Sequence, residues 1–306
     1  MNLNPEQLRG ILLPLPTIFT ETHEIDVQGL CENIAAWNTT GICGYVMLGS
    51  TGERVHLDER EYLHVIETSR AAVPSDFAFI VGAGQQSTIG TIKEIRKAAQ
   101  MGADAVLVIT PHYYRSAIHH QTLVDYYTAV ADASPVPVLL YSMPALTGIK
   151  IEPETIARLS EHPNIAGVKD SSNDIAGFTD TVERCPDNFA VMTGNGTVLL
   201  DALHAGATGG ILAVGCVVPE VCVEIFRAFQ AGEIEHATEL QTKLTPLATA
   251  VTTRYGIGGL KTALEMAGYH GGPVRSPLQL PEERARGEIL ALLKHGLECR
   301  AGAETI

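Results

Sequence analysis

The chain has 306 residues, of which 45% are hydrophobic and 18% charged, and its formal net charge is -14. This length and composition suit one large domain, or one domain with a small appendage, and they exclude wholesale disorder. An acidic surface repels nucleic acid and anionic membranes, so we expect neither as a partner.

The sequence also indicates a cytoplasmic protein. Its six cysteines form no C-x-x-C pair and no zinc spacing, so we expect free thiols in a reducing compartment. The N-terminal segment MNLNPEQLRG is polar, which predicts no secretory signal, and no apolar stretch reaches membrane-spanning length.

One unit recurs along the chain: an amphipathic helical pattern that ends at a glycine and precedes a short apolar run. Three copies surround Gly41, Gly102 and Gly206. Glycine is favoured just past a helix end because it accepts a positive φ without a Cβ clash. The runs are apolar on both faces, as buried parallel strands require. The expected strands lie near residues 11–18, 43–48, 78–83, 105–109, 136–141, 165–169, 189–193 and 208–213.

Helical patterns separate these strands, for example at residues 58–73 and 153–159. Strands that alternate with helices in this way predict an α/β fold, a (β/α)8 TIM barrel over residues 1–230. A doubly wound open sheet is the alternative, but no G-x-G-x-x-G follows the first strand. Past the last strand, segments 219–231, 234–253, 257–266 and 281–297 read as helices, which predicts a C-terminal helical domain over residues 231–306.

Lys169 ends the apolar run 165–168, and functional groups of such barrels lie at the C-terminal ends of the strands. Burial at a dry barrel mouth disfavours the charged ammonium. The neutral amine attacks carbonyl carbon and forms an imine that acts as an electron sink. The pattern therefore indicates a Schiff-base lysine. The alternative is a strand-end lysine that reaches solvent or pairs with Asp170.

Tyr141 ends the preceding strand, one strand–helix unit before Lys169, so its phenol is a candidate proton shuttle. The alternative is a core tyrosine with a satisfied hydroxyl. Ser50 and Thr51 lie in a G-S-T-G segment whose N–H groups, hydroxyls and helix start suit a carboxylate or phosphate. A plain helix N-cap is the alternative there.

Other expected strand ends carry further candidates. Tyr113 is a candidate second phenol, or one of two interface or core aromatics with Tyr114. Gly194, Asn195 and Ile211 are candidate substrate-binding residues, with a turn asparagine as the alternative for Asn195. The pair at residues 119–120 is two histidines without a third ligand, so we expect no metal site.

Three motifs occur in order at these strand ends: G-S-T-G-E at 49–53, Y-S-M-P at 141–144 and G-V-K-D-S at 167–171. Together they resemble the dihydrodipicolinate synthase and N-acetylneuraminate lyase family, and the resemblance extends over nearly the whole chain. It implies a barrel with C-terminal helices, usually a homotetramer, that handles pyruvate and an aldehyde. It also implies a covalent Schiff base in place of any metal or organic cofactor.

The resemblance also assigns roles to residues of this chain. It implies that Lys169 forms the Schiff base with pyruvate and that Tyr141 shuttles protons. It implies that Ser50 and Thr51 hold the pyruvate carboxylate and relay protons. Tyr113 matches a relay tyrosine that is contributed across a subunit interface.

The segment after Tyr141 bears on the aldehyde partner. Family synthases usually carry an asparagine and an arginine where this chain has Ser142 and Leu146. Without that arginine, a guanidinium clamp on the aldehyde's distal carboxylate is missing. Segments such as T-P-H-Y-Y-R at 110–115 look instead like mitochondrial-type 4-hydroxy-2-oxoglutarate aldolases. We therefore expect cleavage of 4-hydroxy-2-oxoglutarate to pyruvate and glyoxylate.

Other functions remain as alternatives. Within the same chemistry they are 4-hydroxy-tetrahydrodipicolinate (dihydrodipicolinate) synthase and a 2-keto-3-deoxy sugar acid aldolase. A non-catalytic sensor barrel that binds a 2-oxo acid needs neither Lys169 nor Tyr141 for binding alone. A phosphate-binding barrel enzyme is a further alternative, but this sequence lacks the glycine-rich phosphate signature that usually follows strands 7 and 8.

Overall fold

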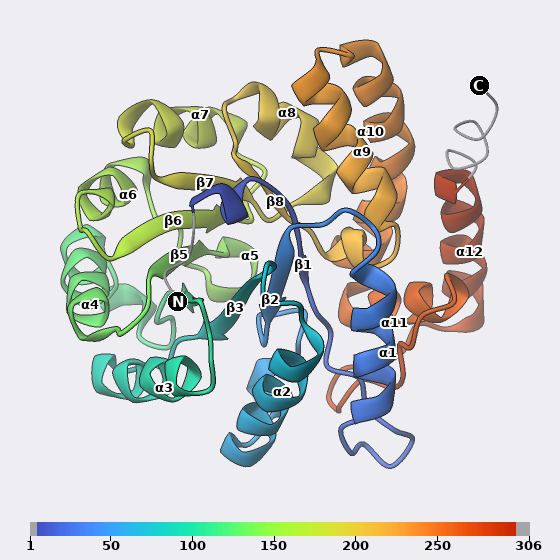
Figure 1. The fold of residues 1–306 in the computed structure, drawn as a ribbon, viewed down its shortest axis with the longest axis horizontal. Helices are drawn as coiled ribbons and strands as arrows, with labels where there is room; N and C mark the ends of the chain where they lie inside the picture. Colours follow the sequence, from blue (N-terminus) through green and yellow to red (C-terminus); the bar gives the residue numbers. More distant parts are fainter. Residues whose placement is uncertain (1–4, 298–306) are drawn as a thin grey trace.

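The computed structural model describes residues 5–297, and at its centre is a closed barrel of parallel strands in the order β1 to β8 (Figure 1). The strands are β1 Gly10–Pro14, β2 Gly44–Met47, β3 Ala78–Ala83, β4 Ala105–Ile109, β5 Val138–Ser142, β6 Ile165–Asp170, β7 Ala190–Thr193 and β8 Gly209–Ile211. Nearly every strand residue is buried, because helices cover the outer face and side chains fill the interior. The predicted (β/α)8 barrel is confirmed.

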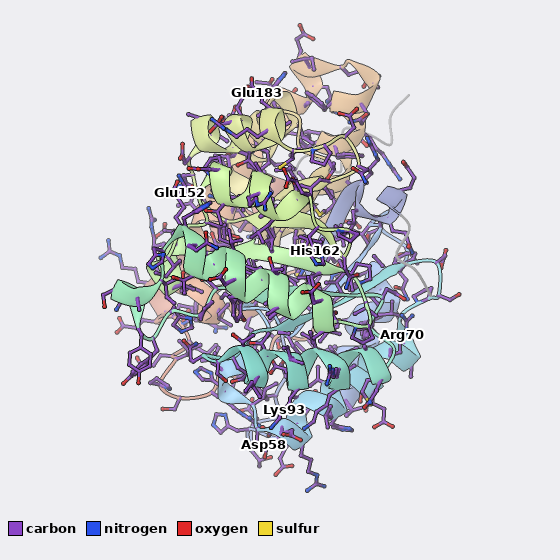
Figure 2. All side chains as sticks on the ribbon, turned by 90° about the vertical axis from the view of Figure 1, so that its left-hand side faces the viewer. Asp58, Arg70, Lys93, Glu152, His162 and Glu183 are labelled. Carbon is purple, nitrogen blue, oxygen red and sulfur yellow. The ribbon has the colours of Figure 1, made fainter. Side chains whose placement is uncertain are left out.

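The helices between the strands follow the predicted pattern. They are α1 Val27–Trp37, α2 Glu59–Ala72, α3 Thr88–Gln100, α4 His120–Ala133, α5 Pro144–Thr147, α6 Pro153–Ser160, α7 Ile175–Arg184 and α8 Leu199–His204. The φ angles of Gly41, Gly102 and Gly206 are 85°, 92° and 97°. Gly102 and Gly206 directly follow the C-caps of α3 and α8, as expected, whereas α1 ends at Trp37 and Gly41 lies in the turn after it. The outer faces of the helices carry charged side chains, among them Lys93 on α3 and Glu183 on α7, which Figure 2 labels.

The expected first strand, residues 11–18, is wrong at its end, since β1 stops at Pro14. The N–H of Leu15 donates one more hydrogen bond, 3.0 Å, to the carbonyl of Val46. Pro16 follows, and a proline has no N–H to continue the ladder. Leu15, Pro16 and Ile18 are apolar because they are buried, not because they pair in a strand.

The C-terminal helices are α9 Pro219–Ala231, α10 Ile234–Thr249, α11 Gly256–Met266 and α12 Glu283–Leu297, and they gather on one side of the barrel (Figure 1). The helix expected over 234–253 is α-helical only as far as Thr249. Ala250–Arg254 then forms a π-helical turn, in which the N–H of Tyr255 donates to the carbonyl of Ala250 at 2.9 Å. The domain boundary at residue 230 stays a prediction, and residues 298–306 lie outside the described residues.

Two layers of apolar side chains form the core. An inner layer fills the barrel and ends near Tyr141, Met192 and Ile211, while a larger outer layer lies between the strands and the helices. Between residues 5 and 297, no helix is both long and apolar enough to span a membrane. The cysteines described are free thiols, as expected: Cys31, Cys43, Cys185, Cys216 and Cys222.

Candidate active site

Lys169 and Tyr141 lie side by side at the C-terminal ends of β6 and β5. The two residues are register partners, and Lys169 Nζ lies 4.6 Å from the centroid of the phenol ring. Their exposures are 5% and 4%, so the lysine does not extend into bulk water. Within residues 5–297, no carboxylate forms an ion pair with Lys169, and the alternative pairing with Asp170 is not observed.

Ser50 brings a second hydroxyl to this pair. Its Oγ lies 3.3 Å from the hydroxyl of Tyr141, and either group can donate that hydrogen bond. Thr51 follows and is buried, with 7% exposure. The loop after β2 therefore places its hydroxyls at the same end of the barrel as the amine, and the Ser50–Tyr141 contact links two strand ends.

The backbone of this loop forms turns rather than a helix start. The N–H groups of Gly52 and Glu53 donate to the carbonyls of Gly49 and Ser50 at 3.1 and 3.2 Å. A 3-10 helix, Arg54–His56, follows, and α2 begins only at Glu59. The expected helix start at this segment is wrong, and neither Ser50 nor Thr51 acts as a helix N-cap.

Gly194 is needed so that the side chain of Lys169 can pass. A Cβ at this position would lie 2.7 Å from Lys169 Cε and 1.9 Å from Ser171 Oγ, well inside van der Waals contact. The N–H of Gly194 donates to the carbonyl of Asp170 at 2.6 Å, which holds the two strand ends together. The G-N-G motif made this glycine a candidate substrate-binding residue. The structure shows why a glycine is required there: the side chain of Lys169 approaches too closely for a Cβ.

Asn195 serves the turn after β7 in this structure. Its Oδ1 accepts hydrogen bonds from the N–H and hydroxyl of Thr197 at 3.0 and 2.8 Å, and its Nδ2 donates to Asn173. These contacts match the turn-asparagine alternative. Ile211 ends β8, is fully buried, and belongs to the same interior cluster as Tyr141.

Tyr113 stands apart from the other candidates. Its side chain is 74% exposed and lies edge-to-face against Tyr114, with ring centroids 5.0 Å apart. Gln86 Oε1 holds this loop by accepting from the N–H groups of His112 and Tyr113, both at 2.9 Å. In the described part of the chain, no hydrogen bond joins the phenol of Tyr113 to Ser50 or Tyr141.

A cavity of about 1090 Å³ opens over the ends of β2 to β5 and continues to an outer rim. Ser50 and Tyr141 line it, and Lys169 lies beside Tyr141 without being part of the lining. Leu146 and Leu278 form part of that rim with 63% and 39% exposure. Sequence reasoning missed the ion pair between Arg54 and Glu94, which also lines the cavity. Each of these two residues follows a different strand, so local sequence carries no signal for the pair.

Asp170 follows Lys169 and is also buried. Burial raises the pKa of the Asp170 carboxyl, and the hydrogen bond that Ser172 N–H donates at 2.7 Å acts in the opposite direction. In the described chain, no group of three or more His, Cys, Asp or Glu residues is arranged to hold a metal ion.

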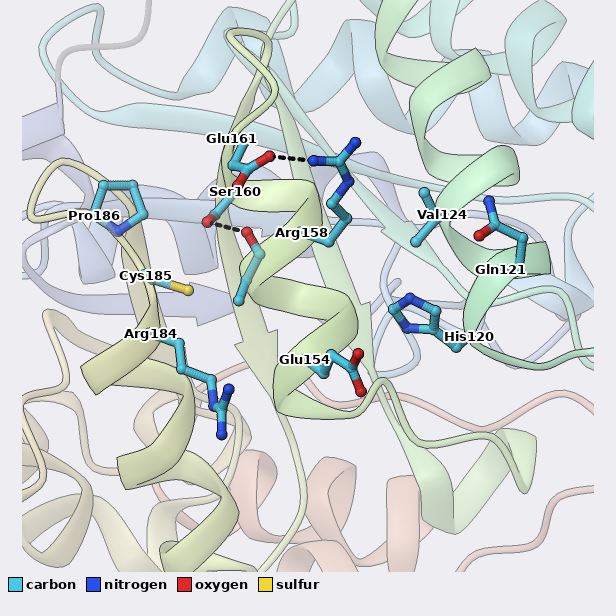
Figure 3. A pocket seen from close by; sticks show the side chains of 11 residues that line it. His120, Gln121, Val124, Glu154, Arg158, Ser160, Glu161, Arg184, Cys185 and Pro186 are labelled. Atoms are coloured by element: carbon cyan, nitrogen blue, oxygen red, sulfur yellow. Dashed lines mark hydrogen bonds and ion pairs between the residues drawn. The ribbon is translucent and has the colours of Figure 1, made fainter.

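A second pocket, of about 670 Å³, lies on the outside of the barrel among α4, α6 and α7 (Figure 3). Two contacts hold polar groups of its lining: Arg158 pairs with Glu161 at 2.6 Å, and Ser160 donates to the carbonyl of Ala157 at 2.7 Å. None of the candidate residues from the strand ends lines it. The candidate active site is therefore the cavity above Tyr141.

A closed (β/α)8 barrel with a buried lysine beside a tyrosine at its mouth defines the class of this protein, a lyase of the class I aldolase type. The chain belongs to the Dihydrodipicolinate synthetase family, whose sequence profile matches residues 7–296. The family resemblance seen in the sequence is confirmed.

Curated relatives carry two different names. The 4-hydroxy-tetrahydrodipicolinate synthase of Methanothrix thermoacetophila is 36% identical over 271 residues, which cover 88% of this chain and 90% of that protein. The probable mitochondrial 4-hydroxy-2-oxoglutarate aldolase of Emericella nidulans is 32% identical over 301 residues, 97% of this chain and 97% of that protein.

Solved structures agree on the fold. A dihydrodipicolinate synthase of Bacillus anthracis has a TM-score of 0.90 at 28% identity, covering 94% of this chain and 98% of that one. YagE of E. coli K12, solved in complex with pyruvate, has a TM-score of 0.88 at 28% identity and covers 94% and 97% of the two chains.

Proposed function

We propose that this chain is a class I aldolase in which Lys169 forms a Schiff base with the 2-oxo carbon of pyruvate. The observation that carries the proposal is the buried pair on adjacent strands, with Lys169 Nζ 4.6 Å from the ring of Tyr141 and Tyr141 in hydrogen-bond contact with Ser50. A sensor that only bound a 2-oxo acid would need neither a buried amine nor a phenol beside it.

Each residue then has a chemical role. The neutral amine of Lys169 adds to the carbonyl, and loss of water from the carbinolamine leaves a protonated imine that withdraws electrons from C3. Tyr141 moves the protons of these steps, and its hydrogen bond to Ser50 connects it to a second hydroxyl. Ser50 and Thr51 hold the carboxylate, with Gly194, Asn195 and Ile211 around the substrate. The imine is the electron sink, so this chemistry requires no metal or organic cofactor.

For the aldehyde partner, the relatives' names support 4-hydroxy-tetrahydrodipicolinate synthase better than the cleavage reaction expected from sequence. Several curated relatives with 34–36% identity carry that name. We therefore take condensation of pyruvate with aspartate semialdehyde as the first candidate reaction. The enamine formed from Lys169 and pyruvate attacks the aldehyde carbon, and Tyr141 gives the new alkoxide its proton.

Cleavage of 4-hydroxy-2-oxoglutarate is the second candidate, and Leu146 favours it. This side chain is 63% exposed at the rim of the cavity, so an aliphatic group stands where a guanidinium would meet the distal carboxylate of aspartate semialdehyde. In the cleavage, Tyr141 removes the 4-hydroxyl proton, the C3–C4 bond breaks, glyoxylate leaves, and hydrolysis of the imine releases pyruvate. The relative from Emericella nidulans carries the name of such an aldolase.

The test has two stages. Incubation with pyruvate and borohydride, followed by peptide mass spectrometry, should place a reduced adduct on Lys169, and Lys169→Ala should lose both adduct and turnover. Pyruvate consumption with aspartate semialdehyde is then compared with glyoxylate release from 4-hydroxy-2-oxoglutarate and with cleavage of 2-keto-3-deoxy sugar acids. Binding of pyruvate without an adduct or turnover would instead identify a sensor.

We also propose a cytoplasmic homotetramer in which Tyr113 of one subunit completes the site of its partner. Large exposed side chains follow four successive strands around the barrel mouth, with exposures of 81%, 69%, 74%, 72% and 63% for Val55, Ile89, Tyr113, Tyr114 and Leu146. Such a group favours burial against another subunit. Sedimentation of the wild type and of Tyr113→Phe tests the assembly, and steady-state turnover of both tests the role of Tyr113: the variant should stay assembled but lose turnover.

A further inference from the structure

A buried ion pair lies directly behind the loop that carries Ser50 and Thr51. Lys261 Nζ, on α11, lies 2.7 Å from Oε1 of Glu53, and both side chains are fully shielded from solvent. Glu53 is the last residue of the G-S-T-G-E segment, so the pair joins this loop to a helix near the C-terminal end of the chain. Of the ion pairs found between residues 5 and 297, it alone has both partners at 0% exposure.

The surroundings of the pair fix it from several sides. Lys261 Nζ donates to the carbonyl of Pro273 at 2.7 Å and lies 4.4 Å from the ring centroid of Phe19. The same ammonium lies 2.7 Å from Glu53 Oε1, so it contacts a carbonyl and a carboxylate oxygen at once. The other oxygen, Oε2, accepts from the N–H of Arg275 at 3.1 Å. Burial lowers the pKa of Lys261, and the adjacent carboxylate of Glu53 acts in the opposite direction.

The loop itself has strained ends. Leu48 and Glu53, which flank the G-S-T-G segment, have φ angles of 56° and 51°, in the left-handed region that ordinary side chains disfavour. Residues remain in such conformations only when the surrounding structure fixes them, and such strain clusters at functional sites. The side chain of Glu53 contacts Lys261, the N–H of Arg275 and the ring of His56 at 3.2 Å, so the ion pair supplies part of the constraint at one end of the segment.

Stability alone does not account for a charged pair at this place. Taking two charges out of water costs about as much as their attraction returns, and an apolar pair of similar volume often stabilises a fold equally well. What the charges add is direction, because the ammonium and the N–H of Arg275 hold the two carboxylate oxygens of Glu53 in defined positions.

We propose that Glu53 and Lys261 are positioning residues that hold the hydroxyls of Ser50 and Thr51 against the substrate carboxylate. Helix α11 thereby contributes to substrate binding without contacting substrate. The inference rests on the proposed role of Ser50 and Thr51 in binding pyruvate. It goes beyond that role by assigning the geometry of the loop to a residue of the C-terminal helices.

The test compares Glu53→Gln, Lys261→Met and the double variant in the full-length protein. Each single variant leaves one buried polar partner uncompensated, so the unfolding midpoint should fall by roughly 5–10 °C. The double variant removes both charges and should regain most of that loss. If the pair positions the loop, the double variant still shows a KM for pyruvate raised roughly 10-fold, because its hydroxyls are misplaced. A wild-type KM in a double variant of restored midpoint overturns the proposal.

Glu53→Asp provides an independent measurement that does not depend on how the double variant folds. It keeps the charge but shortens the side chain by one methylene, which draws the loop toward Lys261. We expect the KM for pyruvate to rise more than kcat falls, and an unchanged KM would contradict the positioning role.

The surface pair Glu239–Lys243 on α10, 2.6 Å apart and 62% and 30% exposed, supplies the matched control. The double variant Glu239→Gln, Lys243→Met should keep the wild-type KM and midpoint. Borohydride trapping of pyruvate on Lys169 of the wild type separates the two hypotheses. If the wild type traps none, the proposed function fails; if it traps normally and the Glu53 variants bind pyruvate as wild type does, only the positioning role fails.

Discussion

Replacing Gly194 with alanine should displace the reactive lysine while leaving the rest of the barrel in place. Gly194 is not among the positive-φ residues, so alanine is compatible with the backbone, and the effect is purely steric. The new Cβ would lie 2.7 Å from Lys169 Cε, whereas ordinary contact begins at 3.4 Å. Lys169 must therefore move by about 0.7 Å, because a packed interior has little room to absorb the overlap.

The expected loss follows from that displacement. A misplacement of about 1 Å at a reacting group costs on the order of 100-fold in rate, so Gly194→Ala should lower kcat by roughly 10- to 100-fold. Overpacking of this kind also destabilises by about 1–3 kcal/mol. Of the two other close atoms, Ser171 Oγ can rotate away, while Ser171 Cβ, 3.0 Å from the new Cβ, must shift by about 0.4 Å.

The assay is the rate at which borohydride traps pyruvate on Lys169, measured together with kcat and the unfolding midpoint. Gly287→Ala is the matched control, since no atom lies within 4 Å of the added Cβ and the position is exposed on α12. It should trap at the wild-type rate and be slightly more stable, because alanine favours a helix over glycine. Trapping by Gly194→Ala at the wild-type rate would refute the claim that this glycine makes room for the lysine.

Three further predictions follow from the site. Tyr141→Phe should lower kcat/KM by roughly 10²- to 10⁴-fold in steady-state assays, because the proton shuttle is lost while the amine remains. Leu146→Arg should raise kcat/KM for aspartate semialdehyde about 10-fold or more, since a charged hydrogen bond contributes about 1.5–3 kcal/mol; no change would place the distal carboxylate elsewhere. Hydrogen bonds from Arg275 lower the pKa of Glu61 in the folded protein. The pair therefore stabilises the fold fully at pH values above the pKa that Glu61 has in the unfolded chain. This stabilisation is lost as the pH falls through the lower pKa of the folded state. In urea titrations, the stability difference between wild type and Arg275→Met should therefore shrink below about pH 4.3, and a constant difference would contradict this linkage.

Local sequence was sufficient for the order and type of most elements. Parallel strands buried on both faces read as short apolar runs, and two of the helices before them end at glycines with positive φ, Gly102 and Gly206. Proline set a boundary that burial alone did not: β1 stops at Pro14 although residues 15–18 remain buried. The family followed from motifs at the strand ends, and the relatives' names shifted the expected substrate toward the synthase.

What the sequence determined by itself was therefore the barrel and the candidate lysine and tyrosine, because hydrophobic period, glycine position and strand-end chemistry are all local properties of the chain. Only the tertiary structure decided which residues meet: the register that sets Tyr141 beside Lys169, the space that Gly194 leaves, and the buried contact of Glu53 with Lys261. These contacts join segments far apart in the chain, and no periodicity records them, because barrel closure and helix packing alone bring such segments together.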